Sequence, residues 1–225
     1  MGNNKGEVDE KPVHEINVDA FHISKYPVTN ADYERYVIDK NLAWQMPIGK
    51  DQHPAVNIKW EDARDYAIWA EMWLLTEAER EKAATWDISK INPEDYKDYK
   101  RVYPWGGEFI EGRCNSNEAN EEDTTLVGKY SPQGDSPCGV VDMVGNVWEW
   151  TSTLFRNYPY EVGDSRENPV SNGGRVLRGR GLIIMTRQSH RANIATILFT
   201  LSAALTLGFC GITSNMSNLN LDKPK

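Results

Sequence analysis

The side chains best suited to redox, nucleophilic or metal chemistry are few and widely spaced in this sequence. The cysteines form no CxxC pair, and the histidines show no metal-ligand spacing, so no zinc site is predicted. A sparse, odd number of cysteines is typical of a protein held in a reducing compartment. The residues concerned are Cys114, Cys138, Cys210, His14, His22, His53 and His190.

One stretch stands out from an otherwise polar chain. Residues 194–207, 14 in all, contain no charge, glycine or proline. They lie between the sequence GGRVLRG at residues 173–179 and the pair Gly208-Phe209. Such a stretch is a buried core segment, a membrane span or a surface that contacts a partner. Choosing among these three decides the function.

Three helices are predicted in the first 90 residues. Thr29 begins the first with a partial capping box. Apolar side chains at helical spacing from Trp60 predict a second helix with one buried face. Thr76 and Glu79 form a full capping box, which opens a third helix running to about Trp86.

The remaining chain predicts irregular structure around short strands. Residues 14–23 alternate apolar and polar side chains, the period of a half-buried strand. Residues 92–174 are rich in glycine, proline and asparagine, which favours loops. We predict one domain over residues 13–213, a disordered leader over residues 1–12 and a frayed tail over residues 214–225.

The charge balance argues against nucleic acid and anionic lipid as partners. The chain of 225 residues carries a net charge of −8, whereas both partners demand a basic surface. Arginines are concentrated in one stretch of the chain, but we interpret them as hydrogen-bond donors to loop carbonyls and carboxylates. These are Arg175, Arg178, Arg180, Arg187 and Arg191. The polar first residues show no signal peptide.

Six blocks of sequence occur in a fixed order: YPVTN at 26–30, HPAV at 53–56 with WEDA at 60–63, LLTEAE at 74–79, YPWG at 103–106, CGVVDMVGNVWEW at 138–150 and RVLRG at 175–179. These blocks resemble the formylglycine-generating enzyme (sulfatase-modifying factor) family. They occur in the family's order and span roughly residues 13–213. The GNVWEW block is the most specific. The resemblance implies an α+β fold of the C-type lectin type, with a small antiparallel sheet, few helices and much irregular loop.

The same resemblance implies a calcium site in the GNVWEW block. Family members bind the ion through positions that match Asp142, Gly145, Val147 and Glu149. Carboxylate and carbonyl oxygens suit calcium, so we expect calcium as the possible cofactor and neither copper nor zinc. Trp148 and Trp150 are expected in the core, because period-two spacing puts both rings on one face of a strand.

The resemblance breaks at the family's catalytic cysteine pair. Matching forward from Arg175, that pair falls at about Ile184 and Ser189, and no cysteine lies between Cys138 and Cys210. Since neither an alkyl chain nor a hydroxyl replaces a thiolate, we predict that this chain is not an enzyme. A formylglycine-generating-type oxidase, or a degenerate relative of one, stays open as an alternative.

A second branch with this fold resembles the chain more fully, namely the variable proteins of diversity-generating retroelements. In that branch an arginine-glycine frame precedes a diversified stretch and Gly-Phe closes it. Here residues 175–179, Arg191-Ala192-Asn193 and Gly208-Phe209 take those places, which puts the variable region at about residues 178–209. Residues 194–207 use six residue types, Ile, Ala, Thr, Leu, Phe and Ser, all within reach of adenine-directed mutation of Asn codons.

This reading makes the chain a ligand-binding protein with a diversified surface, whose partner is an unknown protein or glycan. The expected contacts are Leu182, Ile183, Ile184, Thr186, Gln188, Ser189, Ile194, Thr196, Ile197, Leu198, Phe199, Leu201 and Leu205. Two alternatives stay open: a structural lectin-like domain, and a tail anchor in the uncharged residues 193–221. Scattered polar residues and Gly208 disfavour the membrane. The sequence leaves localisation open between a virion, a cell surface reached through a partner, and the cytoplasm.

Overall fold

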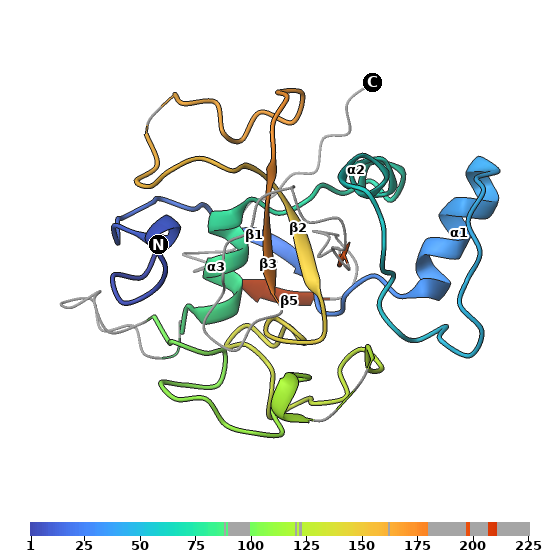
Figure 1. The fold of residues 1–225 in the computed structure, drawn as a ribbon, viewed down its shortest axis with the longest axis horizontal. Helices are drawn as coiled ribbons and strands as arrows, with labels where there is room; N and C mark the ends of the chain where they lie inside the picture. Colours follow the sequence, from blue (N-terminus) through green and yellow to red (C-terminus); the bar gives the residue numbers. More distant parts are fainter. Residues whose placement is uncertain are drawn as a thin grey trace, which may run out of the picture.

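The computed structural model describes residues 1–87, 89, 100–119, 121, 123–161 and 163–179, with the backbone of residues 197–198 and 207–210. The helices are α1 (Asn30–Lys40), α2 (Trp60–Trp69) and α3 (Glu77–Thr85), with short 3-10 turns η1 (Val8–Glu10) and η4 (Asn117–Ala119). The strands are β1 (Phe21–Ser24), β2 (Trp148–Leu154), β3 (Arg175–Gly179), β4 (Ile197–Leu198) and β5 (Leu207–Cys210). Long loops connect these elements (Figure 1).

The predicted helix starts are confirmed by their capping contacts. The Thr76 hydroxyl accepts from the Glu79 N–H at 3.1 Å, and the Glu79 carboxylate accepts from the Thr76 N–H at 2.7 Å. Thr29 and Asp32 make the same reciprocal pair at the start of α1. Each box satisfies two backbone donors that a helix N-terminus leaves without partners.

Two small sheets hold the strands. β2 lies at the centre of the larger sheet, antiparallel to β3 on one side and parallel to β4 on the other. β1 pairs with β5 in antiparallel register, with Phe21 opposite Cys210. The predicted strand over residues 14–23 is shorter than expected, because β5 supplies a partner for Phe21–Ser24 alone. Figure 1 shows α1 and α2 on one side of β2 and β3, and α3 on the other.

Aromatic side chains fill the core between the helices and the larger sheet. Tyr33, Tyr36 and Tyr66 pack in one cluster with Trp60, Trp150 and Leu177. Two buried indoles also donate across the layer: Trp60 to the Thr151 carbonyl at 2.9 Å, and Trp150 to the Ile58 carbonyl at 3.1 Å. These bonds fix the start of α2 against β2. A second apolar cluster joins β1, α3 and residues 140–143.

The tryptophans of the GNVWEW block lie where period-two spacing predicts, with one difference. Trp150 is 4% exposed, whereas Trp148 is partly buried and packs at the edge of the same cluster. Glu149, between them, is itself buried at 2% exposure. Its carboxylate therefore needs a partner inside the protein.

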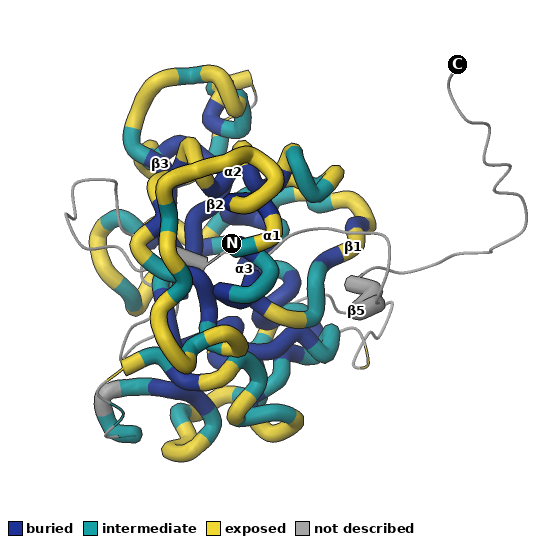
Figure 2. Tube along the Cα trace, turned by 90° about the vertical axis from the view of Figure 1, so that its right-hand side faces the viewer, coloured by how far each residue is buried: buried dark blue, intermediate teal, exposed yellow. Residues whose placement is uncertain are grey.

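The prediction of a disordered leader over residues 1–12 is wrong. The Met1 ammonium donates to the His14 carbonyl at 2.6 Å, and the Asn3 N–H donates to the Glu10 carbonyl at 2.9 Å. Glu10 is 5% exposed. The segment closes as a loop against the body near α3 (Figure 2), so polar composition alone was a poor guide to its order. No helix in the described part of the chain has the length and hydropathy to cross a bilayer.

Candidate functional site

The stretch predicted to contact a ligand begins and ends at strands of the domain. We call residues 180–206 the C-terminal segment. β3 leads into it, β5 follows it, and β4 within it pairs with β2, so that Ile197 lies opposite Trp148 and Leu198 opposite Glu149. Both ends of the C-terminal segment are therefore tied to the scaffold by backbone hydrogen bonds.

Of the predicted contact residues, the structure describes only the backbone of Ile197 and Leu198. The others lie outside the described residues: Leu182, Ile183, Ile184, Thr186, Gln188, Ser189, Ile194, Thr196, Phe199, Leu201 and Leu205. What the structure does show is the framework that positions them.

Arg178 anchors the C-terminal end of β3. Its Nε donates to Glu77 Oε1 at 3.1 Å and its Nη2 to Glu81 Oε2 at 3.2 Å. Nη2 also donates to the Tyr158 hydroxyl at 3.0 Å, which in turn donates to Glu77. Burial alone would lower the pKa of the Arg178 guanidinium, but Glu77, Tyr158 and Glu81 outweigh it and raise the pKa. The charge is thus retained inside the protein.

Glu77 and Glu81 lie one turn apart on α3, so both carboxylates face the same strand. Burial opposes ionisation of Glu81, yet Arg178 and Lys100 hold its pKa below the ordinary value. Lys100 donates to Glu81 Oε1 at 2.7 Å. Sequence spacing gave no sign of this network, because Glu77 and Arg178 are 101 residues apart. The signal available was the i, i+4 carboxylate pair on a helix that must pack.

Arg175 anchors the N-terminal end of β3 in a different way. Its guanidinium donates to the carbonyls of Ser171 at 2.7 Å and of Asn168 and Pro169 at 3.2 Å, and also to Ser152 of β2. The same group stacks on Trp60, 4.2 Å from the ring centroid. The interpretation of the arginines as donors to carbonyls and carboxylates is confirmed for Arg175 and Arg178, while Arg180, Arg187 and Arg191 lie outside the described residues.

Gly179 ends the framework at a point of close backbone approach. Its φ is +139°, and a Cβ there would lie 2.3 Å from the Val147 carbonyl oxygen and 3.3 Å from Trp148 Cα. Only glycine fits this contact. The C-terminal segment therefore starts at a fixed position against β2.

The residues predicted to bind calcium are placed by the structure but do not fit the ion as a set. Glu149 is paired with Arg80, which also donates to the Met143 carbonyl at 2.8 Å. Asp142 Oδ2 accepts from the Gly128 N–H at 2.8 Å, and burial raises the pKa of this carboxyl to about 6. The carbonyl of Val147 faces Gly179, and that of Gly145 accepts from the Val147 N–H. Arg80 already neutralises the Glu149 charge, which argues against calcium at this position. The calcium site that the resemblance implies stays a prediction.

The cysteines differ from what the sequence suggested. Cys138 is disulfide-bonded, which differs from the reducing compartment that the sparse, odd number of cysteines suggested. Cys114 is a free thiol, 4% exposed, and burial raises its pKa to about 11. Neither sulfur is therefore a thiolate at neutral pH. Ile184 and Ser189 lie outside the described residues. Within the described ranges, no group of three or more His, Cys, Asp or Glu is placed to hold a metal.

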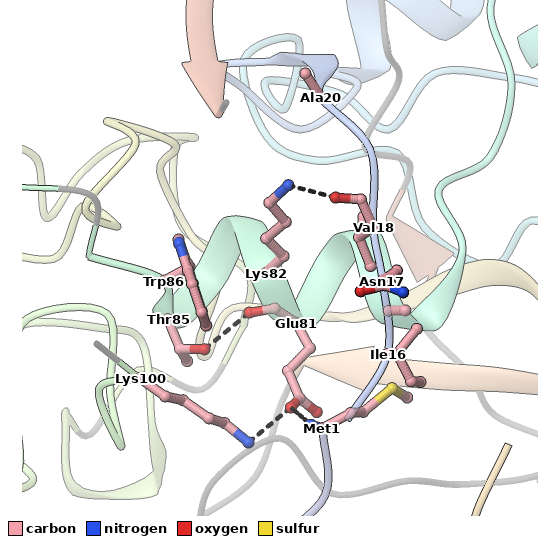
Figure 3. Close-up of a pocket in the computed structure, with 11 residues that line it drawn as sticks. Met1, Ile16, Asn17, Val18, Ala20, Glu81, Lys82, Thr85, Trp86 and Lys100 are labelled. Atoms are coloured by element: carbon pink, nitrogen blue, oxygen red, sulfur yellow. Dashed lines mark hydrogen bonds and ion pairs between the residues drawn. The ribbon is translucent and has the colours of Figure 1, made fainter. Parts of the chain in front are cut away.

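A cavity of about 410 Å³ adjoins the Arg178 network. It lies between α3 and the extended chain at residues 16–20, and Figure 3 shows Glu81 in its wall with Lys100 and Met1 close by. Trp86, Ile16 and Val18 supply apolar surface. The sequence analysis did not find this cavity, because residues far apart in the chain form it.

Together, the loop-rich fold, the arginine anchors and the GNVWEW strand define a scaffold of the sulfatase-modifying type. The chain belongs to the family described as the sulfatase-modifying factor enzyme 1-like domain, whose profile matches residues 1–200. The predicted α+β fold of formylglycine-generating-enzyme type is thereby confirmed.

Among its relatives are active and inactive proteins. It is 32% identical to the serine/threonine-protein kinase pkn1 of Chlamydia pneumoniae, covering 79% of this chain and 30% of that protein. It is 31% identical to hercynine oxygenase of Mycobacterium tuberculosis, covering 76% and 47%. It is 28% identical to the inactive C-alpha-formylglycine-generating enzyme 2 of Bos taurus, covering 91% and 80%. The chain thus spans less than half of the first two.

The fold is also seen among solved structures, over most of the chain. Treponema denticola variable protein 1 superposes with a TM-score of 0.61, covering 89% of each chain at 18% identity. At this identity the likeness establishes the fold and leaves the function to be argued from the site.

Proposed function

We propose that this chain is a non-catalytic ligand-binding protein that presents the C-terminal segment as a diversified surface. The observation that carries the proposal is the anchoring of β3. Arg178, Glu77 and Glu81 hold the entry to the segment through contacts that use none of its side chains. A scaffold of this kind tolerates rewriting of the segment, because the framework is stabilised elsewhere.

Two comparisons support the proposal. The fold is shared with Treponema denticola variable protein 1, and the relatives include the inactive C-alpha-formylglycine-generating enzyme 2 of Bos taurus. The sequence adds that the positions matching the family's catalytic cysteines are Ile184 and Ser189. We infer that the family's thiol chemistry was lost while its shape was kept, and that a protein or glycan is the ligand.

The test is to rewrite two predicted contacts and measure stability and binding separately. Phe199→Ser and Leu201→Asn should leave the thermal midpoint within about 2 °C, because surface changes alter stability by at most about 0.5 kcal/mol. The same variants should lose the ligands that the parent retains on protein and glycan arrays. A drop on the order of 10 °C with unchanged binding would instead assign the segment to the core.

A second measurement separates the proposal from the oxidase alternative. A cysteine-containing peptide is incubated with the protein and copper, and the product is followed by mass spectrometry. We expect no aldehyde, since the matching positions hold no thiol. Conversion of the peptide would overturn the proposal. The genome offers a third check, because diversification requires a neighbouring reverse transcriptase and an adenine-rich near-copy of the 3′ coding sequence.

A further inference from the structure

The two cysteines with described side chains have opposite chemical states. Cys114 is free and buried, and its raised pKa keeps it protonated at neutral pH. Cys138 is disulfide-bonded. The sequence contains three cysteines in all. A bond at Cys138 therefore has one other cysteine of the chain available to it.

Cys138 lies next to β1, one of the two strands of the β1–β5 ladder. It is partly buried and packs against the cluster that contains Phe21 and Ile23 of β1. In the same ladder the backbone of Phe21 lies opposite Cys210, and Ser24 lies opposite Leu207, the first residue after the C-terminal segment. The neighbourhood of Cys138 is thus where the chain returns to the scaffold.

We propose that the disulfide of Cys138 is a structural cross-link within the chain that fixes the exit of the C-terminal segment to the scaffold. At the entry, Arg178 performs the equivalent task through ion pairs. At the exit, β5 has only four residues, and a strand this short gains little from its own hydrogen bonds. A disulfide supplies the missing restraint, because it reduces the number of conformations open to the unfolded chain and so favours the folded state.

Forming this bond requires an oxidising partner. Two thiols lose two protons and two electrons as one S–S bond forms. The electrons pass to a protein disulfide oxidant, whose own S–S bond breaks to give two thiols. Such exchange runs in secretory, periplasmic or cell-surface compartments and is opposed in a reducing cytosol. We therefore infer that the chain matures in an oxidising compartment, an inference that does not depend on whether the protein binds a ligand.

Peptide mapping under non-reducing conditions tests the bond directly. Free thiols are alkylated in denaturant before digestion of the full chain purified from a bacterial periplasm. We expect Cys114 to be alkylated and the Cys138 peptide to be linked, within one chain, to the peptide that contains Cys210. Alkylation of Cys138, or a link to a second copy of the chain, would overturn the proposal.

Thermal unfolding then measures what the bond contributes. Dithiothreitol should lower the midpoint of the wild type by on the order of 10 °C, the usual scale for losing a native disulfide. Cys138→Ala should start low and show no response to the reductant. Cys114→Ala is the matched control and should respond as the wild type does. A wild-type midpoint that does not change with dithiothreitol would contradict the proposal. This measurement on the wild type remains valid even if Cys138→Ala fails to fold.

Hydrogen exchange locates the effect. On reduction, the amides of β1 should exchange at least tenfold faster, because their ladder partner is released, while those of α2 keep their rates. Equal acceleration of both elements would indicate general destabilisation and would contradict a local restraint at the exit.

Discussion

Arg178 Nε donates to Glu77 Oε1 at 3.1 Å, and this contact joins β3 to α3 across 101 residues of chain. Both partners are almost completely buried, with side-chain exposures of 3% and 0%. A buried charge that loses its partner costs far more than a surface charge, since water cannot replace the missing contact.

Arg178→Met should therefore destabilise the protein by about 3–5 kcal/mol, because the buried carboxylate of Glu77 loses its guanidinium partner while Glu81 keeps only Lys100 and the Met1 ammonium as the cations shown beside it. The free energy of unfolding in urea measures the effect. Arg64→Met is the control, since Arg64 pairs with Asp65 at the surface and such pairs contribute at most about 1 kcal/mol. Equal losses in the two variants would show that the network is not an anchor.

The capping boxes give a prediction with an internal control. Thr76→Ala should cost about 1 kcal/mol, because the Glu79 N–H loses its acceptor at the start of α3. Lys59 occupies the same position at the start of α2 but makes no side-chain cap. Lys59→Ala should consequently leave the unfolding free energy unchanged. A matching loss at Lys59 would remove capping as the cause.

Stability should depend on pH through Glu167. Burial, with Glu77 nearby, raises the pKa of this carboxyl to about 7, although the Thr153 hydroxyl lies 2.8 Å from Oε2. The folded state then holds a proton that the unfolded state releases above pH 4.5. Stability therefore falls as pH rises from about 4.5 to about 7.

Glu167→Gln should flatten this slope and be relatively more stable above pH 7, by on the order of 3 kcal/mol. Urea unfolding at pH 5 and pH 8 measures the difference between variant and wild type. Glu161→Gln, at an exposed position of the same loop, should follow the wild type at both values. A slope that survives in Glu167→Gln would assign it to another group.

Calcium offers a direct check of the Glu149 geometry. Because Arg80 neutralises Glu149, millimolar calcium should not raise the thermal midpoint relative to EDTA. A rise of several degrees that Glu149→Gln abolishes would show that the carboxylate leaves Arg80 for the ion, and would restore the predicted ligand set.

The sequence predicted what local chemistry determines. Thr29 and Thr76 marked their helix starts, and Trp60 with Ala63 and Ala67 marked a buried face. It did not predict what distant partners determine. Neither β5 beside β1 nor Glu77 beside Arg178 leaves a periodic signal, because each pairing is made in space and not along the chain. The leader was missed for a related reason: its order comes from contacts with α3.

The close approach at Gly179 has an evolutionary consequence. Any process that changes codons in the adjoining tract meets a hard border there, since every other amino acid would collide with Val147. Variants with a substitution at residue 179 would misfold and be lost by selection, whatever ligand they could bind. The lack of a Cβ at residue 179 thus sets the first position at which the sequence can change without misfolding.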